Sequence, residues 1–226
     1  MKRPLMCCYI SGRPERNALF IVGFLISLQC VASATNHLLP FTYSFDRELR
    51  PLLEKRLFVT PADHGRMVEL PAGPQPGESS IAVYCVSSAN RCYVTRTAAA
   101  QNMDYVFAEN RRDPLAAVRR VRIHRNDAEI PRSTASVIQA AWRRMLTATR
   151  PIGSYARPRL HAERIEFALV ETSGKLVAAE LPDNPGRKVI ALVSLGRRVG
   201  DYAVAAEAER PRLLDEINVR AQELAR

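Results

Sequence analysis

The chain has 226 residues, with 33 Lys and Arg against 23 Asp and Glu, and a formal net charge of +10. This length fits one globular domain with a sizeable core better than two small domains. The sequence shows no internal repeat and no coiled-coil pattern of useful length, which excludes the repeat and coiled-coil classes of protein.

The first 34 residues have the three zones of a cleavable secretory signal peptide. A leader with four basic residues precedes the eleven uncharged residues 18–28, and an Ala-x-Ala site follows at Ala32 and Ala34. We expect cleavage after Ala34 and export to the periplasm or the exterior. The uncharged run is close to half of the roughly 20 apolar residues that a spanning helix needs, which favours cleavage over an uncleaved anchor.

Two features of this leader leave alternatives open. Met6 offers a later start than Met1, and both starts keep the apolar run intact. Cys30 suggests a lipoprotein, but Gln29 stands where a small residue normally precedes the modified cysteine. A lipid anchor is therefore disfavoured.

Residues 35–226 are expected to form a single domain outside the cytoplasm. They contain 29 basic and 22 acidic residues, a net charge of +7, and their only lysines are Lys55, Lys175 and Lys188. A GC-rich genome would explain this excess of arginine without any function. Recognition of phosphate or carboxylate by the planar guanidinium is the functional alternative.

The predicted elements begin with a mixed pattern over 35–57 that ends in a short helix, constrained by Pro51. Residues 67–70 read as a strand, and the loop 71–77 is rich in proline and glycine. Two β-rich runs then surround a polar turn at 87–90, which predicts a hairpin.

The two cysteines that remain after cleavage, Cys85 and Cys92, predict a disulfide. Folding the chain about the turn 87–90 places them directly opposite each other, in the close pairing that suits a bridge. Their spacing is too wide for a CxxC redox or zinc motif, so a structural disulfide is favoured over an exchangeable one. The inward face would then hold Ile81, Val83, Cys85, Cys92 and Val94.

Downstream of the hairpin, 104–108 and 118–124 are predicted strands, the second with apolar and basic side chains on opposite faces. Helical spacing of apolar residues predicts a helix that starts near Ser133 and ends at Arg150, with Trp142 in the core. The loop 151–162 contains two prolines and a glycine and is predicted to be a flexible contact loop.

A second hairpin is predicted over 165–181, with its turn at Ser173 and Gly174. Two helices follow, 189–203 and 213–224, and in the first Gly196 and Gly200 would let another element approach closely. Hairpins grouped together, with helices placed after them, predict an α+β domain. We expect a mainly antiparallel sheet built from hairpins, with about three helices packed on one face.

Several classes of enzyme lack their signatures in this sequence. No serine is flanked as in Gly-x-Ser-x-Gly, the four histidines are far apart, and no glycine-rich loop follows a strand. No cofactor and no metal are therefore expected. Asp63 and His64 are the nearest candidates for an acid–base pair, although ordinary solvation of a polar loop is favoured for them.

Arginines supply the candidate anion-binding residues. The densest basic run, 119–125, would place alternate side chains on one exposed strand face, where they could bind a polyanion. A simpler explanation of the run is that its charges keep a sheet face soluble and prevent edge-to-edge pairing. No aromatic residue is interleaved with the run for base stacking, which argues against nucleic acid as a partner. The candidates are Arg119, Arg120 and Arg122 of this run and Arg157 and Arg159 of the contact loop.

The function expected from these features is that of an exported, non-enzymatic binding or accessory module that contacts an anionic envelope component or another envelope protein. One alternative is an exported hydrolase with a non-standard active site. Another is a structural subunit of an envelope assembly that uses the helix face 196–203 as its interface. No membrane span is expected in the mature chain, and the oligomeric state is left open.

Overall fold

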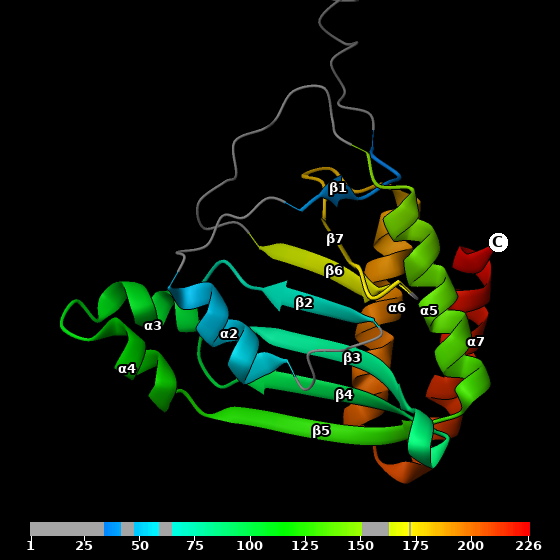
Figure 1. Ribbon diagram of the computed structural model, residues 1–226, viewed down its shortest axis with the longest axis horizontal. Helices are drawn as coiled ribbons and strands as arrows, with labels where there is room; N and C mark the ends of the chain where they lie inside the picture. The colour runs from blue at the N-terminus through cyan, green and yellow to red at the C-terminus, as the bar shows by residue number, and fades with distance from the viewer. Residues whose placement is uncertain (1–33, 42–47, 59–64, 151–162, 172) are drawn as a thin grey trace, which may run out of the picture. The chain divides into compact units, whose positions relative to one another are not determined.

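A seven-stranded antiparallel sheet forms the centre of the structure, a computed structural model (Figure 1). The structure describes residues 34–41, 48–58, 65–150, 163–171 and 173–226, which all lie in one compact unit, Ala34–Arg226. The spatial order of the strands is β1-β7-β6-β2-β3-β4-β5. In chain order they are β1 (Leu39–Pro40), β2 (Arg66–Leu70), β3 (Ser79–Val86), β4 (Arg91–Ala99), β5 (Ile123–Ile130), β6 (Arg164–Val170) and β7 (Leu176–Glu180).

Both predicted hairpins are confirmed. β3 and β4 pair around the short 3₁₀ turn Ser87–Ala89, and Asn90 closes the turn with a left-handed φ of 50°. The register places Cys85 opposite Cys92, and a disulfide joins them with their Cα atoms 4.0 Å apart. β6 and β7 form the second hairpin, with a turn at Gly174.

Three long helices, α5 (Arg132–Thr147), α6 (Arg187–Val204) and α7 (Arg210–Ala225), build the main core on one side of the sheet. α5 and α6 contact the strands directly, and α7 packs on α5 and α6. Trp142 is fully buried and meets Phe167 of β6 edge to face, as expected for a core residue. The sequence predicted all three helices because their apolar residues recur at helical spacing.

Gly196 and Gly200 bring α6 close to the sheet. A Cβ atom on Gly196 would lie 2.4 Å from the sulfur of Met67, and one on Gly200 would lie 2.7 Å from Cδ1 of Ile81. The close approach predicted for these glycines is therefore made to β2 and β3. The helix face that would have served as the interface of a structural subunit is buried inside the protein.

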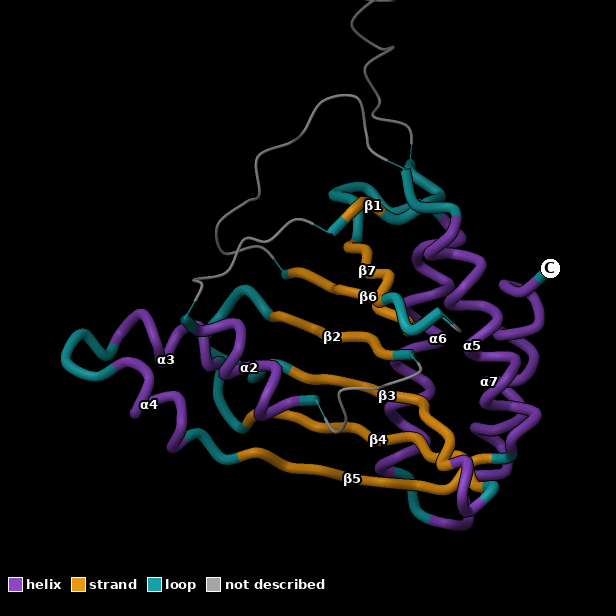
Figure 2. The backbone as a smooth tube through the Cα atoms, in the orientation of Figure 1, coloured by secondary structure: helices purple, strands orange, loops and turns teal. Residues whose placement is uncertain are grey.

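The opposite face of the sheet carries α2 (Leu49–Leu57), which lies in front of the strands in Figure 2, whereas α6 lies behind them. α3 (Met103–Glu109) and α4 (Pro114–Arg120) lie beyond the ends of the central strands. These three short helices enclose a second, smaller core. Its buried members are Leu49, Leu53, Leu57, Ala99, Met103, Val118 and Val121.

The strand predicted over 104–108 is wrong, because these residues belong to α3. Asn102 caps the helix by accepting a hydrogen bond from the backbone N–H of Tyr105 at 3.0 Å. Glu78 accepts hydrogen bonds from the N–H groups of Met103 and Asp104 at 2.8 and 3.0 Å. Most of the first-turn donors are thus paired with side chains, which stabilises a helix where the apolar residues alone suggested a strand.

The strand predicted over 118–124 is also wrong in its position. Its first three residues form the last turn of α4, and β5 begins at Ile123 and continues to Ile130. Asp113 and Pro114 supply a regular helix start, since the Asp113 side chain accepts a hydrogen bond from the N–H of Ala116. β5 lies at the edge of the sheet and its middle residues are exposed, so it lacks the apolar alternation that marks a half-buried strand.

The α+β class and the antiparallel sheet are confirmed, but the arrangement of helices is richer than about three on one face. The described ranges contain six α-helices, three in the layer of α5, α6 and α7 and three at the opposite face and end. Within those ranges, no helix has the length and apolar character required to cross a membrane.

Candidate anion-binding site

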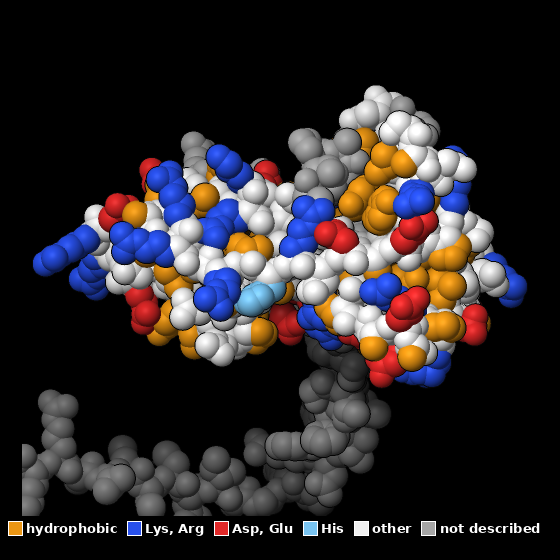
Figure 3. Space-filling view, turned by 90° about the horizontal axis from the view of Figure 1, so that it is seen from below, with side chains coloured by type: hydrophobic (Ala, Val, Ile, Leu, Met, Phe, Trp, Pro, Cys, Tyr) orange, Lys and Arg blue, Asp and Glu red, His pale blue; other side chains and the backbone are white. Residues whose placement is uncertain are grey.

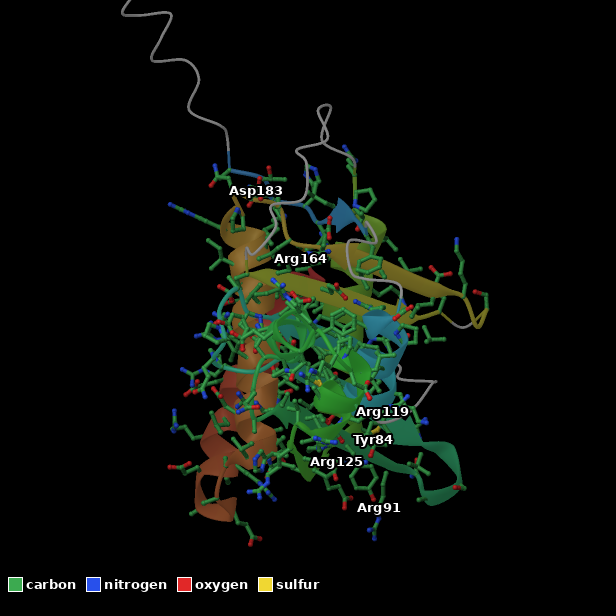
Figure 4. The ribbon with its side chains drawn as sticks, turned by 90° about the vertical axis from the view of Figure 1, so that its left-hand side faces the viewer. Tyr84, Arg91, Arg119, Arg125, Arg164 and Asp183 are labelled. Carbon is green, nitrogen blue, oxygen red and sulfur yellow. A yellow bond between two sulfur atoms is a disulfide. The ribbon has the colours of Figure 1, made fainter. Side chains whose placement is uncertain are left out.

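Five exposed arginines gather where α3 and α4 lie, and together they form what we call the basic cap. In Figure 3, Lys and Arg side chains cluster at this left-hand end, whereas farther right they alternate with acidic and hydrophobic side chains. Figure 4 looks toward the same end and labels Arg119 there. The members of the basic cap are Arg111, Arg112, Arg119, Arg120 and Arg122.

Buried neighbours explain why the basic cap points outward. Val118 and Val121 are buried in the smaller core, and the arginines that alternate with them in sequence are therefore directed to solvent. Arg111 and Arg112 occupy the connection between α3 and α4, directly before the helix start at Asp113. A turn between two short helices exposes both side chains.

α2 holds the C-terminal end of α4 in place through Arg56. This side chain donates a hydrogen bond to the carbonyl oxygen of Val118 at 2.8 Å and a second to that of Val121. The N–H of Val121 also donates to the carbonyl oxygen of Val118, so the guanidinium adds a second donor there and complements the helix dipole. Arg56 is thus used inside the fold, while its neighbours in the basic cap are not.

Within the described ranges, none of the five arginines of the basic cap forms an ion pair. The acidic residues nearest in sequence are occupied in other ways. Asp113 caps α4, and Glu109 accepts a hydrogen bond from the Tyr105 hydroxyl, which raises the pKa of that tyrosine. Arg125 of β5, in contrast, pairs with Asp127 at 3.0 Å and does not belong to the basic cap.

Two buried polar residues fix α3, and with it the basic cap, to the sheet. Asn102 donates hydrogen bonds to the carbonyl oxygens of Pro71 at 2.9 Å and Gly73 at 2.7 Å, and Glu78 binds the first turn of α3. Burial raises the pKa of Glu78, and the N–H groups of Met103 and Asp104 oppose this by stabilising its charged form.

Arg50 and Arg164, beside the main sheet, are paired with carboxylates, in contrast to the basic cap. Arg50 of α2 and Glu166 are both buried, with 6 % and 3 % of their surface exposed. Guanidinium nitrogens of Arg50 lie 2.8 Å from a carboxylate oxygen of Glu166 and 2.7 Å from one of Glu54. Burial acts to lower the pKa of Arg50, but the two carboxylates outweigh it and raise that pKa. Arg164 and Glu180, paired at 2.9 Å, extend the network.

The candidate residues taken from the sequence are only partly brought together. Arg119, Arg120 and Arg122 lie in one exposed cluster, but on a helix end and the segment after it instead of along one strand. Arg111 and Arg112 were missed, although the helix start at Asp113–Pro114 marks them as a turn between helices. Arg157, Arg159, Asp63, His64 and Ala32 lie outside the described residues, and Ala34 is exposed.

The chemistry available at the basic cap is that of binding anions. Several guanidinium groups without carboxylate partners can each form two parallel hydrogen bonds to a phosphate or carboxylate. The described residues contain no group of three or more His, Cys, Asp or Glu side chains arranged to hold a metal ion. Comparisons of the chain with family models, with curated proteins and with solved structures gave no match.

Proposed function

We propose that this protein is an exported, non-enzymatic binding module that attaches to a phosphate-bearing surface of the cell envelope through the basic cap. The observation that carries the proposal is the absence of ion pairs, within the described ranges, at five neighbouring exposed arginines. Charge that is not neutralised inside the fold is available to a partner. Export rests on the signal-peptide pattern and is compatible with the disulfide between Cys85 and Cys92.

The position of the basic cap favours a broad partner over a small one. α3 and α4 extend past the ends of the central strands in Figure 1, and a hollow in the described surface lies elsewhere, between the β3–β4 turn and the start of α5. A small anion is usually held in a concave site that surrounds it. A projecting group of arginines instead suits an array of phosphate groups, as on an anionic bilayer or a polyphosphate.

Charge reversal at the basic cap tests the proposal. The purified protein is mixed with vesicles of phosphatidylcholine that contain phosphatidylglycerol, and in a second arm with immobilised polyphosphate, and the bound fraction is measured. Since each basic residue near an anionic bilayer contributes about 1 kcal/mol, the double substitution Arg119→Glu and Arg120→Glu should weaken vesicle binding by at least about tenfold. Raising the salt concentration should weaken binding by the wild type as well.

The matched control places the same charge change on a different helix. Arg187 and Lys188 are exposed at the start of α6, and Arg187→Glu with Lys188→Glu changes the net charge by the same amount. The control should bind nearly as well as the wild type. Equal losses in both variants would mean that total charge, and not the basic cap, controls binding, and retention that does not respond to salt would contradict the proposal.

A further inference from the structure

A pair of tyrosines on the sheet face opposite the disulfide adjoins a hollow in the surface. Tyr84 of β3 and Tyr93 of β4 are paired directly across the two strands, and their rings stack with centroids 5.7 Å apart. Both side chains are partly exposed. Two register positions nearer the turn, on the same face of the sheet, Val86 lies opposite Arg91 and is 36 % exposed. The accessible surface of the aromatic pair therefore continues toward the turn.

The hollow lies where the β3–β4 turn meets the start of α5 and has a volume of about 260 Å³. Pockets for drug-sized ligands hold roughly 300–1,000 Å³, so this hollow suits a single small unit. Four of its lining residues offer hydrogen-bonding side chains, and the others are Cys92, Ile130 and Pro131. The polar four are Asn90, Arg91, Glu129 and Arg132.

Arg91 connects the hollow with the aromatic pair. A hydrogen bond with Tyr93 raises the pKa of Arg91, and the negative charge of Glu129, 3.7 Å away, acts in the same direction. Glu129 is also the residue of β5 that lies directly opposite Tyr93. Figure 4 labels Tyr84 and Arg91 in the lower part of the view, on the neighbouring strands β3 and β4.

The charges of the hollow favour a ligand with one negative group. Arg91 and Glu129 offset each other, while Arg132 hydrogen-bonds to the side-chain oxygen of Asn90 and forms no ion pair within the described ranges. One positive charge is therefore left over in the hollow. A purely apolar ligand would bury these polar groups without partners, which costs free energy.

The disulfide makes this part of the sheet rigid. It joins Cys85 and Cys92, the neighbours in sequence of Tyr84 and Tyr93, from the opposite face of the same two strands. A cross-link between two strands limits how far the tyrosines that they carry can separate. Side chains held in place before binding lose less conformational entropy when a ligand binds.

We propose that this end of the β3–β4 hairpin is a binding site for a saccharide that carries a carboxylate. The C–H groups of one sugar ring pack on the tyrosine pair, and its hydroxyl groups bond to Asn90 and Glu129. The carboxylate of the neighbouring unit enters the hollow and pairs with Arg132 and Arg91. This site is separate from the basic cap and does not rest on the function proposed for it.

Binding of two short oligosaccharides to the purified protein tests this site. The probes are a trisaccharide of galacturonic acid and the corresponding neutral trisaccharide of galactose, titrated by calorimetry. The acidic trisaccharide should bind at least tenfold more tightly than the neutral one. Tyr93→Leu and Arg132→Ala should each weaken its binding at least tenfold.

Matched controls separate this site from other exposed residues. Tyr105→Leu changes an exposed tyrosine of α3, and Arg143→Ala changes an exposed arginine of α5, and neither should alter the affinity. Thermal unfolding of every variant shows that it is folded. Equal affinity for both trisaccharides would overturn the role of the carboxylate, and absence of saturable binding, or binding unchanged by Tyr93→Leu, would overturn the site.

The variant with two reversed charges in the basic cap distinguishes the saccharide site from the envelope-binding function proposed above. Arg119→Glu with Arg120→Glu should leave the affinity for the acidic trisaccharide unchanged, because these residues do not line the hollow. Loss of saccharide binding in that variant would place the ligand on the basic cap and would refute the hairpin site. Loss of vesicle binding alone supports two separate sites.

Discussion

The basic cap and the surroundings of Arg50 use arginine in opposite ways. Arg50 is buried between α2 and the sheet and is neutralised by Glu166 and Glu54, whereas the five arginines of the basic cap face solvent without ion pairs in the described ranges. A buried guanidinium requires its partners because an unpaired buried charge is very costly. The comparison separates arginine that holds the fold together from arginine that is available for binding.

The largest loss of stability is expected from breaking the buried ion pair between Arg50 and Glu166. Arg50→Ala leaves the carboxylate of Glu166 buried without its closest partner, which typically lowers the free energy of unfolding by about 3–5 kcal/mol. Urea denaturation followed by circular dichroism measures the loss.

Arg120→Ala is the matched substitution in the basic cap. Since its side chain is exposed, the expected change is within about 0.5 kcal/mol. A loss below about 1 kcal/mol for Arg50→Ala would contradict a structural role for the buried pair. A large loss for Arg120→Ala would remove the distinction between the two regions.

An intermediate effect is expected from the disulfide. Cys85→Ala together with Cys92→Ala removes a cross-link that closes a short loop, which should lower the free energy of unfolding by about 2 kcal/mol. Vesicle binding through the basic cap should not change, since the cap and the disulfide lie at different ends of the strands. A parallel loss of vesicle binding would show that the two regions are coupled.

The smallest change in stability is expected from the ionisation of Glu78, which binds the first turn of α3. Burial raises the pKa of Glu78 in the folded protein, so its contribution to stability is fully present below its ordinary pKa and is lost as the pH rises through the raised value. Glu78→Gln does not titrate in this range. The stability of the wild type relative to Glu78→Gln should therefore fall as the pH rises above the ordinary pKa of a glutamate, about 4.3.

Urea denaturation of both proteins at several pH values measures this difference. A difference that stays constant would show that burial of the Glu78 carboxyl does not control its ionisation. A difference that grows as the pH rises would mean that the hydrogen bonds from α3 outweigh burial. Either result would change the explanation of how Glu78 fixes α3 to the sheet.

Local patterns made most of the fold predictable. The spacing of Cys85 and Cys92 around a polar turn was sufficient to predict the register of β3 and β4, and apolar periodicity was sufficient for α5, α6 and α7. Those elements bury one continuous face, so their sequence carries the pattern directly.

Contacts between distant residues made the rest unpredictable. α3 is stabilised by Glu78, 25 residues before Met103, and Arg50 meets Glu166 across 116 residues. No local pattern shows such pairs. The basic cap was only partly predicted because 118–120 form a helix end that packs on α2, which placed its arginines differently from those of a strand.

The order of the elements along the chain has a consequence for how the protein is made. Met67, Ile81 and Val94 belong to strands in the first half of the chain, but the helices that cover them extend from Arg132 to Ala225. A chain that emerges from a ribosome or a secretion channel with its N-terminus first therefore presents an uncovered apolar sheet until its last third follows. Such surfaces are prone to aggregation. Chains that terminate before α6 should depend on chaperones, whereas chains that include α6 and α7 cover the sheet themselves.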